Sequence, residues 1–320
     1  MMARRIPDPR IPEPRVAVLL ATYNGAPWLR EQLDSLLRQT HDNWVLYWRD
    51  DGSGDGSVAI LQAFGQQAGQ GRCVRVEQPQ GRLGATGNFL TLLRSVSDRM
   101  AEPDMVAFAD QDDVWLPQKL ERGVAALRHA PRDEPILYCA RQVLVDATLQ
   151  HLGLSHQISR PTGFPAALTQ NVATGCTVML NRPGARLVAA SRPSTGTLHD
   201  WWAYLLVTAA GGRLIQDAEP VVLYRQHAQN LVGAPASMAS RAIAALHRGP
   251  ALFMTVLREH IGALLAQPDL LSERARAELV TLDRALRSGP WRRLSALRMH
   301  GLHRQTWPET LLFRCWFLIG

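Results

Sequence analysis

The chain lacks the features that mark disulfide-rich, zinc-binding or membrane-spanning proteins. Its four cysteines are far apart and form no CxxC pair, which excludes a disulfide framework and a zinc knuckle. No stretch approaches the roughly 20 consecutive apolar residues of a membrane-spanning helix. Residues 1–14 are rich in Pro and Arg and lack the apolar run of a signal peptide. We therefore expect a cytoplasmic protein with reduced thiols.

Lysine is almost absent, and the positive charge is unevenly spread. The chain contains 34 arginines and one lysine, Lys119, a bias that we attribute to composition rather than to chemistry. Residues 238–320 carry twelve arginines and six acids, a net charge of +6 out of +7 for the whole chain. This region has helical character to its end. It fits either helices packed on the rest of the chain or an interfacial helix lying on anionic lipid. Because no nucleic-acid-binding motif accompanies the charge, we expect no nucleic-acid partner.

Four strand-to-helix units precede residue 130. Apolar runs at residues 16–23, 44–49, 73–78 and 104–110 are each followed by a polar loop and a segment with helical spacing. This order predicts an α/β fold with a mostly parallel sheet and helices on both faces. Later residues are less regular: we expect one or two strands at 136–146, another within 171–181, helices at 183–191 and 199–211, and two strands between 213 and 227.

Three carboxylates, Asp110, Asp112 and Asp113, follow the fourth apolar run directly. Ligands of such sheets gather at the carboxyl ends of the strands. A solvated acidic turn is the simpler interpretation, but Val114 and Trp115 return at once to apolar sequence. Crowded carboxylates repel one another unless a cation neutralises them, and oxygen ligands favour Mg²⁺ or Mn²⁺. Because Mg²⁺ usually keeps only one or two protein carboxylates together with substrate phosphates, the cluster predicts a nucleoside diphosphate or triphosphate ligand.

A second acidic loop follows the run at residues 44–49. Asp55 and Gly56 are typical of a turn. Asp50 and Asp51 stand at the end of the strand itself, where a carboxylate could accept a hydrogen bond from a uracil or thymine imide or from a ribose hydroxyl. One of these two acids is therefore expected to bind the nucleotide.

These strings together resemble a known family. VAVLLATYNG, WRDDGSGDGS, GATGN, FADQDDVWLP, TGCTVMLN, HDWWAYLL and YRQHAQNLVGA follow one another over about residues 15–233. In this order they resemble the inverting family 2 glycosyltransferases, whose fold is called GT-A: a Rossmann-like mixed sheet flanked by helices. The last three are similar to the bacterial rhamnosyltransferases of surface-polysaccharide synthesis. The implied division is a disordered arm at 1–14, a GT-A domain at 15–233 and a basic helical extension at 237–320.

The resemblance also implies roles for individual residues. Asp200 matches the catalytic base, although it could simply cap the helix that it begins. Trp201 and Trp202, with His199, would offer an aromatic surface to the acceptor sugar. The predicted donor-binding residues are Thr22, Tyr23, Asp50, Asp51, Asn88 and Asp112. The predicted ligands of Mg²⁺ or Mn²⁺ are Asp110, Asp113 and His227, of which His227 could instead be an ordinary hydrogen-bonded histidine.

The sequence lacks the QxxRW element of chain-polymerising relatives, which indicates transfer of one sugar or a few. The expected donor is a dTDP- or UDP-sugar, with dTDP-rhamnose favoured by the resemblance. The expected acceptor is a glycan or a lipid-linked glycan. A nucleotidyltransferase would also combine such a sheet with paired carboxylates, but no basic phosphate-binding loop appears near the start. A catalytically silent sugar-nucleotide-binding scaffold is the other alternative.

Overall fold

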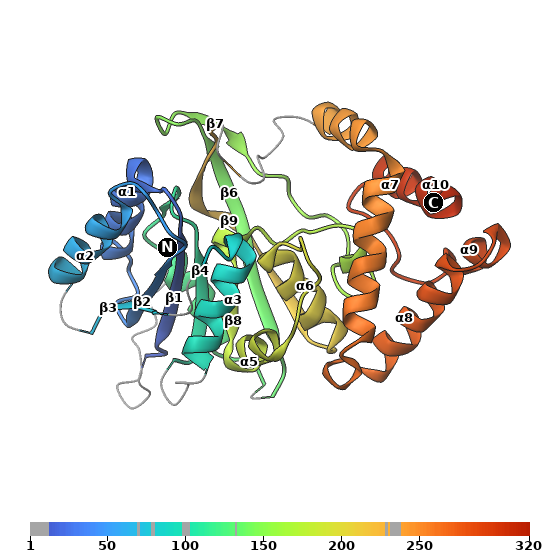
Figure 1. Ribbon diagram of the computed structural model, residues 1–320, viewed down its shortest axis with the longest axis horizontal. Coiled ribbons are helices and arrows are strands. Elements are labelled where there is room, and N and C mark those ends of the chain that lie inside the picture. The colour runs from blue at the N-terminus through green and yellow to red at the C-terminus, as the bar shows by residue number, and fades with distance from the viewer. Residues whose placement is uncertain are drawn as a thin grey trace, which may run out of the picture.

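A nine-stranded sheet runs through the molecule with helices on both of its faces (Figure 1). The computed structural model describes residues 13–68, 71–77, 81–97, 103–131, 133–227, 230 and 238–320, with side chains from residue 249 onward in the last range. Residues 1–12 of the predicted arm and the predicted boundary at 233–237 lie outside the described residues. The strands follow the order β3-β2-β1-β4-β8-β6-β9-β5, and β7 pairs with β6.

One half of the sheet is parallel, as the four strand-to-helix units predict. Its strands are β1 (Val16–Thr22), β2 (Trp44–Asp50), β3 (Cys73–Arg75) and β4 (Met105–Ala109). In register, Thr22 lies opposite Asp50, and Leu20 lies opposite Ala109. The carboxyl ends of β1, β2 and β4 therefore meet at one edge, so their loops can share a site.

The other half is antiparallel or mixed, which corrects the expectation of a mostly parallel sheet. Its strands are β5 (Val114–Trp115), β6 (Ile136–Val145), β7 (His151–Leu154), β8 (Met179–Asn181) and β9 (Arg213–Arg225). The three-residue β8 pairs antiparallel with both β4 and β6 and so reverses the direction in mid-sheet. A strand this short carries no directional signal in its sequence. The two strands expected between 213 and 227 form one strand, whose pairing with β6 shifts register around Arg141.

Two apolar cores lie on opposite faces of the sheet. Along β1, Val16, Val18 and Leu20 face one core, whereas Ala17 and Leu19 face the other, because successive strand side chains alternate. The first core also contains residues of α1 (Ala26–Leu37), α2 (Ser57–Ala68) and α4 (Lys119–Leu127). The second contains residues of α3 (Gly84–Ser97), α5 (Arg182–Ala190) and α6 (His199–Ala209).

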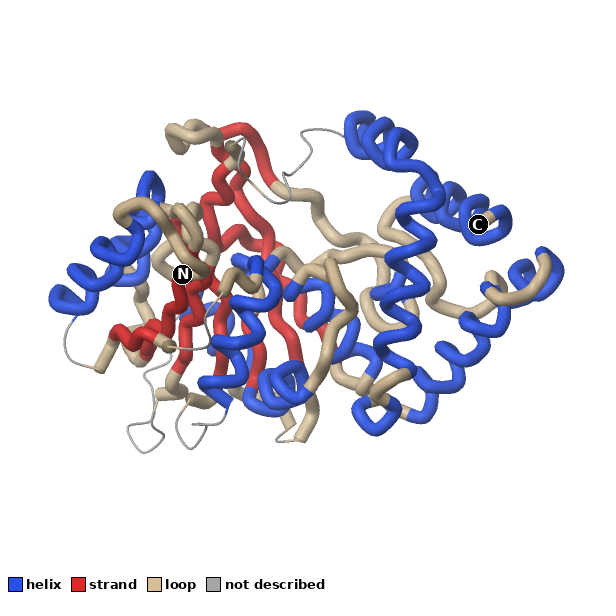
Figure 2. Tube along the Cα trace, viewed as in Figure 1, coloured by secondary structure: helices blue, strands red, loops and turns tan. Residues whose placement is uncertain are grey.

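The C-terminal helices extend the second core, and Figure 2 shows them gathered at one end of the molecule. They are α7 (Met238–Leu265), α8 (Glu273–Leu286), α9 (Pro290–Ala296) and α10 (Trp307–Ile319). The backbone of α7 breaks at Gly249, which has φ 73° and precedes Pro250. Leu257 and Ile261 of α7 belong to the same buried cluster as Trp202 and Leu206 of α6. None of the described helices has both the length and the apolar character needed to cross a membrane.

Candidate active site

The loops after β1 and β4 are joined by Gln111, a residue that the sequence reasoning missed. Its Oε1 accepts hydrogen bonds from the Thr22 hydroxyl at 2.7 Å and from the Tyr23 N–H at 2.9 Å. Its Nε2 donates to the Tyr23 carbonyl at 3.1 Å. A Cβ at Gly25 would lie 2.3 Å from Gln111 Oε1, so this close approach requires glycine. Thr22 is buried and fixes the loop, while Tyr23 remains partly open.

Tyr23 has a cationic neighbour that the sequence did not reveal. The Arg82 guanidinium lies 3.7 Å from the centroid of the Tyr23 ring, a distance at which cation–π attraction stabilises the pair. Arg82 itself is exposed. The pair therefore presents an aromatic face and a positive charge at the edge where a nucleoside diphosphate is expected.

Asp50 and Asp51 are engaged within the protein. Asp50 accepts hydrogen bonds from the N–H groups of Gly52 and Ser53, which makes it a turn residue. Asp51 is buried, forms a 2.8 Å ion pair with Arg49 and accepts the Leu83 N–H at 2.8 Å through the same oxygen. The other oxygen of Asp51 accepts the Gly84 N–H at 2.8 Å, so this carboxylate ties the end of β2 to the start of α3. The donor-binding roles of Asp50 and Asp51 stay predictions.

Asn88 is also a structural residue here. It lies in α3 with 2% of its surface exposed, and its Nδ2 donates to the Arg49 carbonyl at 3.3 Å. Its Oδ1 has no hydrogen-bond partner among the described atoms. The predicted donor contact of Asn88 stays a prediction.

The three acids after β4 occupy different environments. Asp110 and Asp112 are half-buried, whereas Asp113 is fully buried. Burial, with the nearby charges of Asp112 and Asp200, raises the pKa of Asp110 to about 8. Burial also raises the pKa of Asp113, and the charges of Asp112 and Asp110 raise it further. The crowding inferred from the sequence is real, and it extends to Asp200.

A buried cation and a thiol lie beside these acids. Ligand atoms of Asp110, Asp113 and Cys176 come within 4.8 Å of one another. Lys119 is fully buried on α4 with its ammonium 3.0 Å from the centroid of the Trp115 ring, and it has no hydrogen-bond partner among the described atoms. Burial lowers the pKa of Lys119 to about 7 against the raising effect of its acidic neighbours. The single lysine of the chain thus lies beside the acidic group. That it is the one lysine among 35 basic residues was the only sign of this in the sequence.

His227 faces Asp112. One ring nitrogen, Nε2, lies 2.9 Å from Asp112 Oδ2, and the imidazole stacks on Trp28 with ring centroids 5.3 Å apart. This pairing differs from the predicted metal set, in which His227 joins Asp110 and Asp113. The buried Arg225 connects the loop after β4 to α1, because its guanidinium donates to the Asp112 carbonyl and to Glu31 and lies over the Trp28 ring.

Asp200 stands in the first turn of α6 and is held by backbone amides. Its Oδ2 accepts the Gly175 N–H at 2.9 Å, and its Oδ1 accepts the Trp201 N–H at 2.6 Å. Burial raises the pKa of Asp200 to about 6, although these hydrogen bonds oppose the shift. A Cβ at Gly175 would lie 2.9 Å from His199 Nε2, so glycine is needed for this approach. Leu198, not Asp200, occupies the N-cap position.

The aromatic residues around Asp200 are mostly core residues. Trp202 has no exposed surface, and its indole donates to the Ser191 hydroxyl at 2.7 Å. The ring lies in the core and offers no exposed face, and its acceptor contact stays a prediction without support from this geometry. His199 is likewise buried, stacks on Phe89 at 3.9 Å and has its pKa lowered to about 3 by burial. Trp201 is only partly buried and stays a candidate.

The side chains that could ligate a hard divalent cation suit it better at the partly exposed rim of the site, formed by Asp112 and His227, than in the buried interior. Asp112 and His227 offer an oxygen and a nitrogen that already lie 2.9 Å apart, and both side chains are partly accessible. The inner group includes Cys176, whose pKa is raised by burial, so its thiol stays protonated and is a poor ligand for Mg²⁺. Among the described residues Asp113 Oδ2 is buried without a hydrogen-bond partner, so this inner oxygen could add one more ligand to those of Asp112 and His227.

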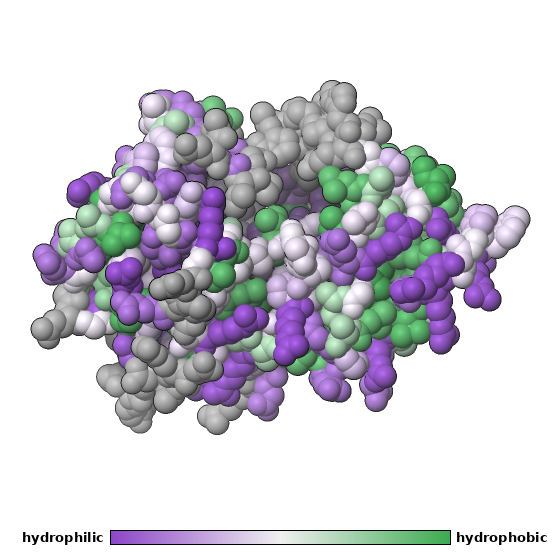
Figure 3. Space-filling view, in the orientation of Figure 1, coloured by the Kyte–Doolittle hydropathy of each residue, from purple (hydrophilic) through white to green (hydrophobic). Residues whose placement is uncertain are grey.

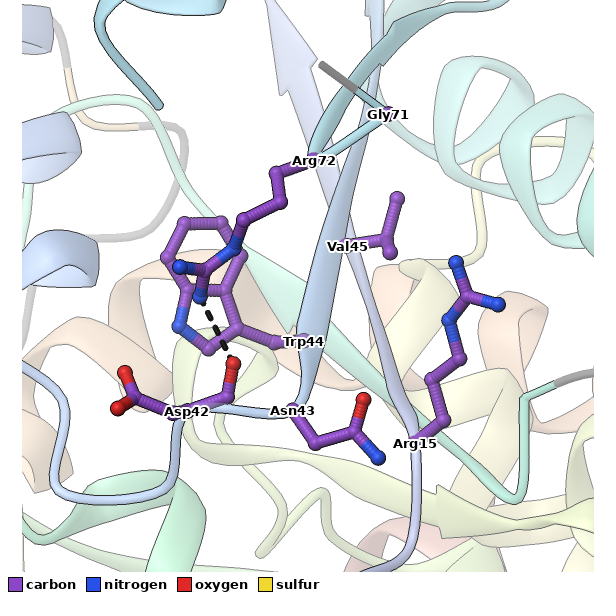
Figure 4. Close-up of a pocket in the computed structure, with 7 residues that line it drawn as sticks. All are labelled: Arg15, Asp42, Asn43, Trp44, Val45, Gly71 and Arg72. Atoms are coloured by element: carbon purple, nitrogen blue, oxygen red, sulfur yellow. Dashed lines mark hydrogen bonds between the residues drawn. The ribbon is translucent and has the colours of Figure 1, made fainter. Parts of the chain in front are cut away.

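A separate hollow of about 390 Å³ lies at the opposite edge of the sheet (Figure 4). Its lining includes Arg15, before β1, and Trp44, the first residue of β2. Arg72 lies over the Trp44 ring at 4.1 Å and donates to the Asp42 carbonyl. Because it lies at the amino ends of the strands, this hollow is separate from the acidic edge.

The architecture is an α/β fold of the GT-A type. The staphylococcal TarS fragment 1–349 in complex with UDP-GlcNAc has a similar fold, with a TM-score of 0.56, 15% identity, and coverage of 88% of this chain and 73% of that one. The predicted GT-A fold, with its C-terminal helices, is thereby confirmed.

Sequence comparison identifies the family. Residues 17–171 match the model described as Glycosyl transferase family 2, so this segment is a glycosyltransferase domain of that family. It is 26% identical to the dTDP-rhamnosyl transferase RfbG of Shigella flexneri over 235 residues, which cover 69% of this chain and 76% of RfbG. It is 28% identical over 112 residues to WfgD of Escherichia coli, described as a UDP-Glc:alpha-D-GlcNAc-diphosphoundecaprenol beta-1,3-glucosyltransferase, and covers 40% of that protein.

Proposed function

We propose that this enzyme transfers a single sugar, with inversion, from a dTDP- or UDP-sugar to a hydroxyl of a glycan or lipid-linked acceptor in cell-surface polysaccharide synthesis. The similarity to RfbG favours dTDP-rhamnose as the donor. The diphosphoundecaprenol acceptor in the description of WfgD favours a lipid-linked acceptor. Such an acceptor would be reached from the cytoplasm by peripheral contact with an anionic membrane.

The observation that carries this proposal is the convergence of acids from distant segments. Asp110 and Asp112 follow β4, Asp200 begins α6 and His227 follows β9. The charges of Asp112 and Asp200 both raise the pKa of Asp110, and His227 contacts Asp112. Single displacement at an anomeric carbon requires a group that neutralises the departing diphosphate and a separate base for the acceptor hydroxyl. The Asp112–His227 pair would serve the first need and Asp200 the second.

At the donor end, Asp112 and His227 would hold Mg²⁺ or Mn²⁺, with Asp110 beside them. When bound, the ion offsets the negative charge that develops on the departing diphosphate. Tyr23 and Arg82 would contact the nucleotide, since the aromatic face and the guanidinium lie together at this edge. Gln111 keeps the Tyr23 loop in place through three hydrogen bonds to Thr22 and Tyr23.

At the acceptor end, Asp200 would take the proton of the attacking hydroxyl as its oxygen bonds to the anomeric carbon and the bond to the diphosphate breaks. The Gly175 and Trp201 amides fix the orientation of the carboxylate. With a pKa raised to about 6, Asp200 is ionised at neutral pH and is a stronger base than an ordinary aspartate. The partly exposed Trp201 would lie beside the acceptor ring.

The test is a transfer assay with dTDP-rhamnose, UDP-sugars and GDP-sugars, each with Mn²⁺, Mg²⁺ or EDTA. We expect transfer or slow donor hydrolysis with one pyrimidine donor, lost in EDTA, and a product whose anomeric configuration is opposite to that of the donor. Retention of configuration, or activity unchanged in EDTA, would contradict the mechanism. Donor binding without transfer or hydrolysis would favour the scaffold, and release of pyrophosphate from a nucleoside triphosphate would favour the nucleotidyltransferase.

A further inference from the structure

A groove of about 590 Å³ lies between α8 and α9, far in sequence from the acidic edge. Ala285 and Ala296 are buried and form part of its floor with Met299, while Arg284 and Arg292 are exposed. Among the described residues, neither of these two guanidiniums pairs with a carboxylate. A groove with an apolar floor and two unneutralised cations suits an amphipathic anion.

Exposed apolar side chains lie next to these arginines. Trp291, adjacent to Arg292, has 82% of its surface exposed, and Leu294 one turn further on α9 has 41%. An exposed tryptophan flanked by arginine is typical of segments that lie in the interface of a membrane, where the indole sits at the level of the headgroups.

The neighbouring helix α10 carries a second apolar strip. Trp307, Leu311, Cys315 and Ile319 follow one another at four-residue spacing, and all four are exposed. The opposite face, with Phe313 and Phe317, is buried, so α10 is apolar on both sides. Packing in the core accounts for the apolar residues of the buried side and not for those of the exposed side.

Helices α9 and α10 adjoin, because Arg293 of α9 donates to the Leu318 carbonyl of α10. The space-filling view shows hydrophobic and strongly hydrophilic residues close together over this end of the molecule (Figure 3). Residues 238–320 supply +6 of the total charge of +7, which complements an anionic surface.

We propose that the α8–α10 end docks on an anionic lipid bilayer, with a phosphate-bearing lipid headgroup in the α8–α9 groove between Arg284 and Arg292. Trp291 and the α10 strip enter the boundary between headgroups and acyl chains. This inference deepens the membrane contact of the proposed function and rests on it. It assigns the contact to particular side chains, separate from the catalytic ones.

The experiment is cosedimentation of the full chain with phosphatidylcholine vesicles containing or lacking 30% phosphatidylglycerol. An arginine near an anionic surface contributes about 1 kcal/mol, so R284A/R292A should weaken partition into the anionic vesicles about 30-fold. The matched control is R274A/R276A, which removes the same charge from exposed positions of α8 outside the groove. L311S should weaken binding even in high salt, since it removes apolar contact.

Equal partition into both kinds of vesicle, or equal losses in the test and control doubles, would overturn the headgroup site. A concentration-dependent dimer that L311S abolishes, with no vesicle binding, would make a second copy the occupant and also overturn it. Thermal unfolding of each variant confirms folding. Donor hydrolysis should be unchanged in R284A/R292A. Asp200→Asn should bind vesicles normally and lack transfer. Failure of this inference can therefore be told from failure of the proposed function.

Discussion

Asp200 and the Asp112–His227 pair are the side chains on which the proposed chemistry depends. Both lie in the same acidic neighbourhood as Asp110, yet they are held by different partners: backbone amides hold Asp200, and His227 contacts Asp112. Substitutions can therefore separate proton removal from metal and donor binding.

Asp200→Asn should abolish transfer and leave donor binding nearly intact. The amide keeps one oxygen, which can accept from either the Gly175 or the Trp201 N–H, and it cannot take up a proton, so we expect a loss of about 10² to 10⁴ in kcat. Initial rates with calorimetry of donor binding measure the two effects. Asp146→Asn, at an exposed loop acid, is the control. A variant with more than a tenth of the wild-type rate would exclude Asp200 as the base.

The rate of sugar transfer should fall as the pH is lowered below about 6. Because burial raises the pKa of Asp200 to about 6 and only its ionised form can act as a base, kcat/KM for the acceptor should drop about tenfold per pH unit below pH 6. The profile is measured between pH 5 and 8.5 with donor and Mn²⁺ saturating. A rate that stays level down to pH 5 contradicts the assignment.

His227→Ala should raise the Mn²⁺ concentration needed for half-maximal activity by about tenfold or more, since one proposed ligand is removed. His156→Ala, at an exposed histidine, should leave the metal requirement unchanged. Titration of activity with Mn²⁺ distinguishes them. If both variants respond to Mn²⁺ like the wild type, His227 is an ordinary hydrogen-bonded residue.

At the scale of elements, the β1–α1 loop depends on the missing side chain of Gly25. Gly25→Ala would place a Cβ 2.3 Å from Gln111 Oε1, so the joint between the β1 and β4 loops must shift, at a cost of about 1–3 kcal/mol in stability. Donor affinity should fall with it, since Tyr23 moves. Gly262→Ala in α7 meets no atom within 4 Å and should be neutral or slightly stabilising. Thermal unfolding of both variants checks this, and equal melting temperatures would contradict the role of Gly25.

The strongly patterned elements could be predicted from the sequence. The run at 16–23 and the leucines that follow it become β1 and α1, because near-continuous apolar residues and helical spacing are signals internal to each segment. The direction of β8 and the union of residues 213–225 into one strand could not be predicted. Both are decided by pairing with β6, a partner distant in the chain.

The site was predictable only in part, for a similar reason. The acidic residues after β4 and Asp200 at the start of α6 were identified because charge beside an apolar run is visible in sequence. Gln111, Arg82 and Arg225 were missed, because their importance comes from contacts with Tyr23 and Glu31 rather than from their own residue type. The burial of Trp202 was not foreseen, since an aromatic residue next to Asp200 in the sequence can face either the site or the core.

At the scale of the whole molecule, the C-terminal helices should be needed for folding. Leu257 and Ile261 share a buried cluster with Trp202 and Leu206, so a chain ending at residue 232 would expose the apolar side of α6. We expect this truncation to aggregate or to lose its cooperative thermal transition, as measured by size exclusion and scanning calorimetry. A truncated chain that unfolds cooperatively and binds donor would contradict this prediction. Point variants are accordingly the better test of lipid contact.

The position of α6 also bears on recombination between relatives. Residues 17–171, which match the family model, share a buried cluster with α5 and α6, and α6, which carries Asp200, packs through Trp201 against His260 of α7. A chimera that exchanges residues 17–171 alone would therefore set foreign side chains against α5 and α6 inside this cluster. A chimera that imports a foreign α6 would likewise have to import the α7 to α10 that share its core.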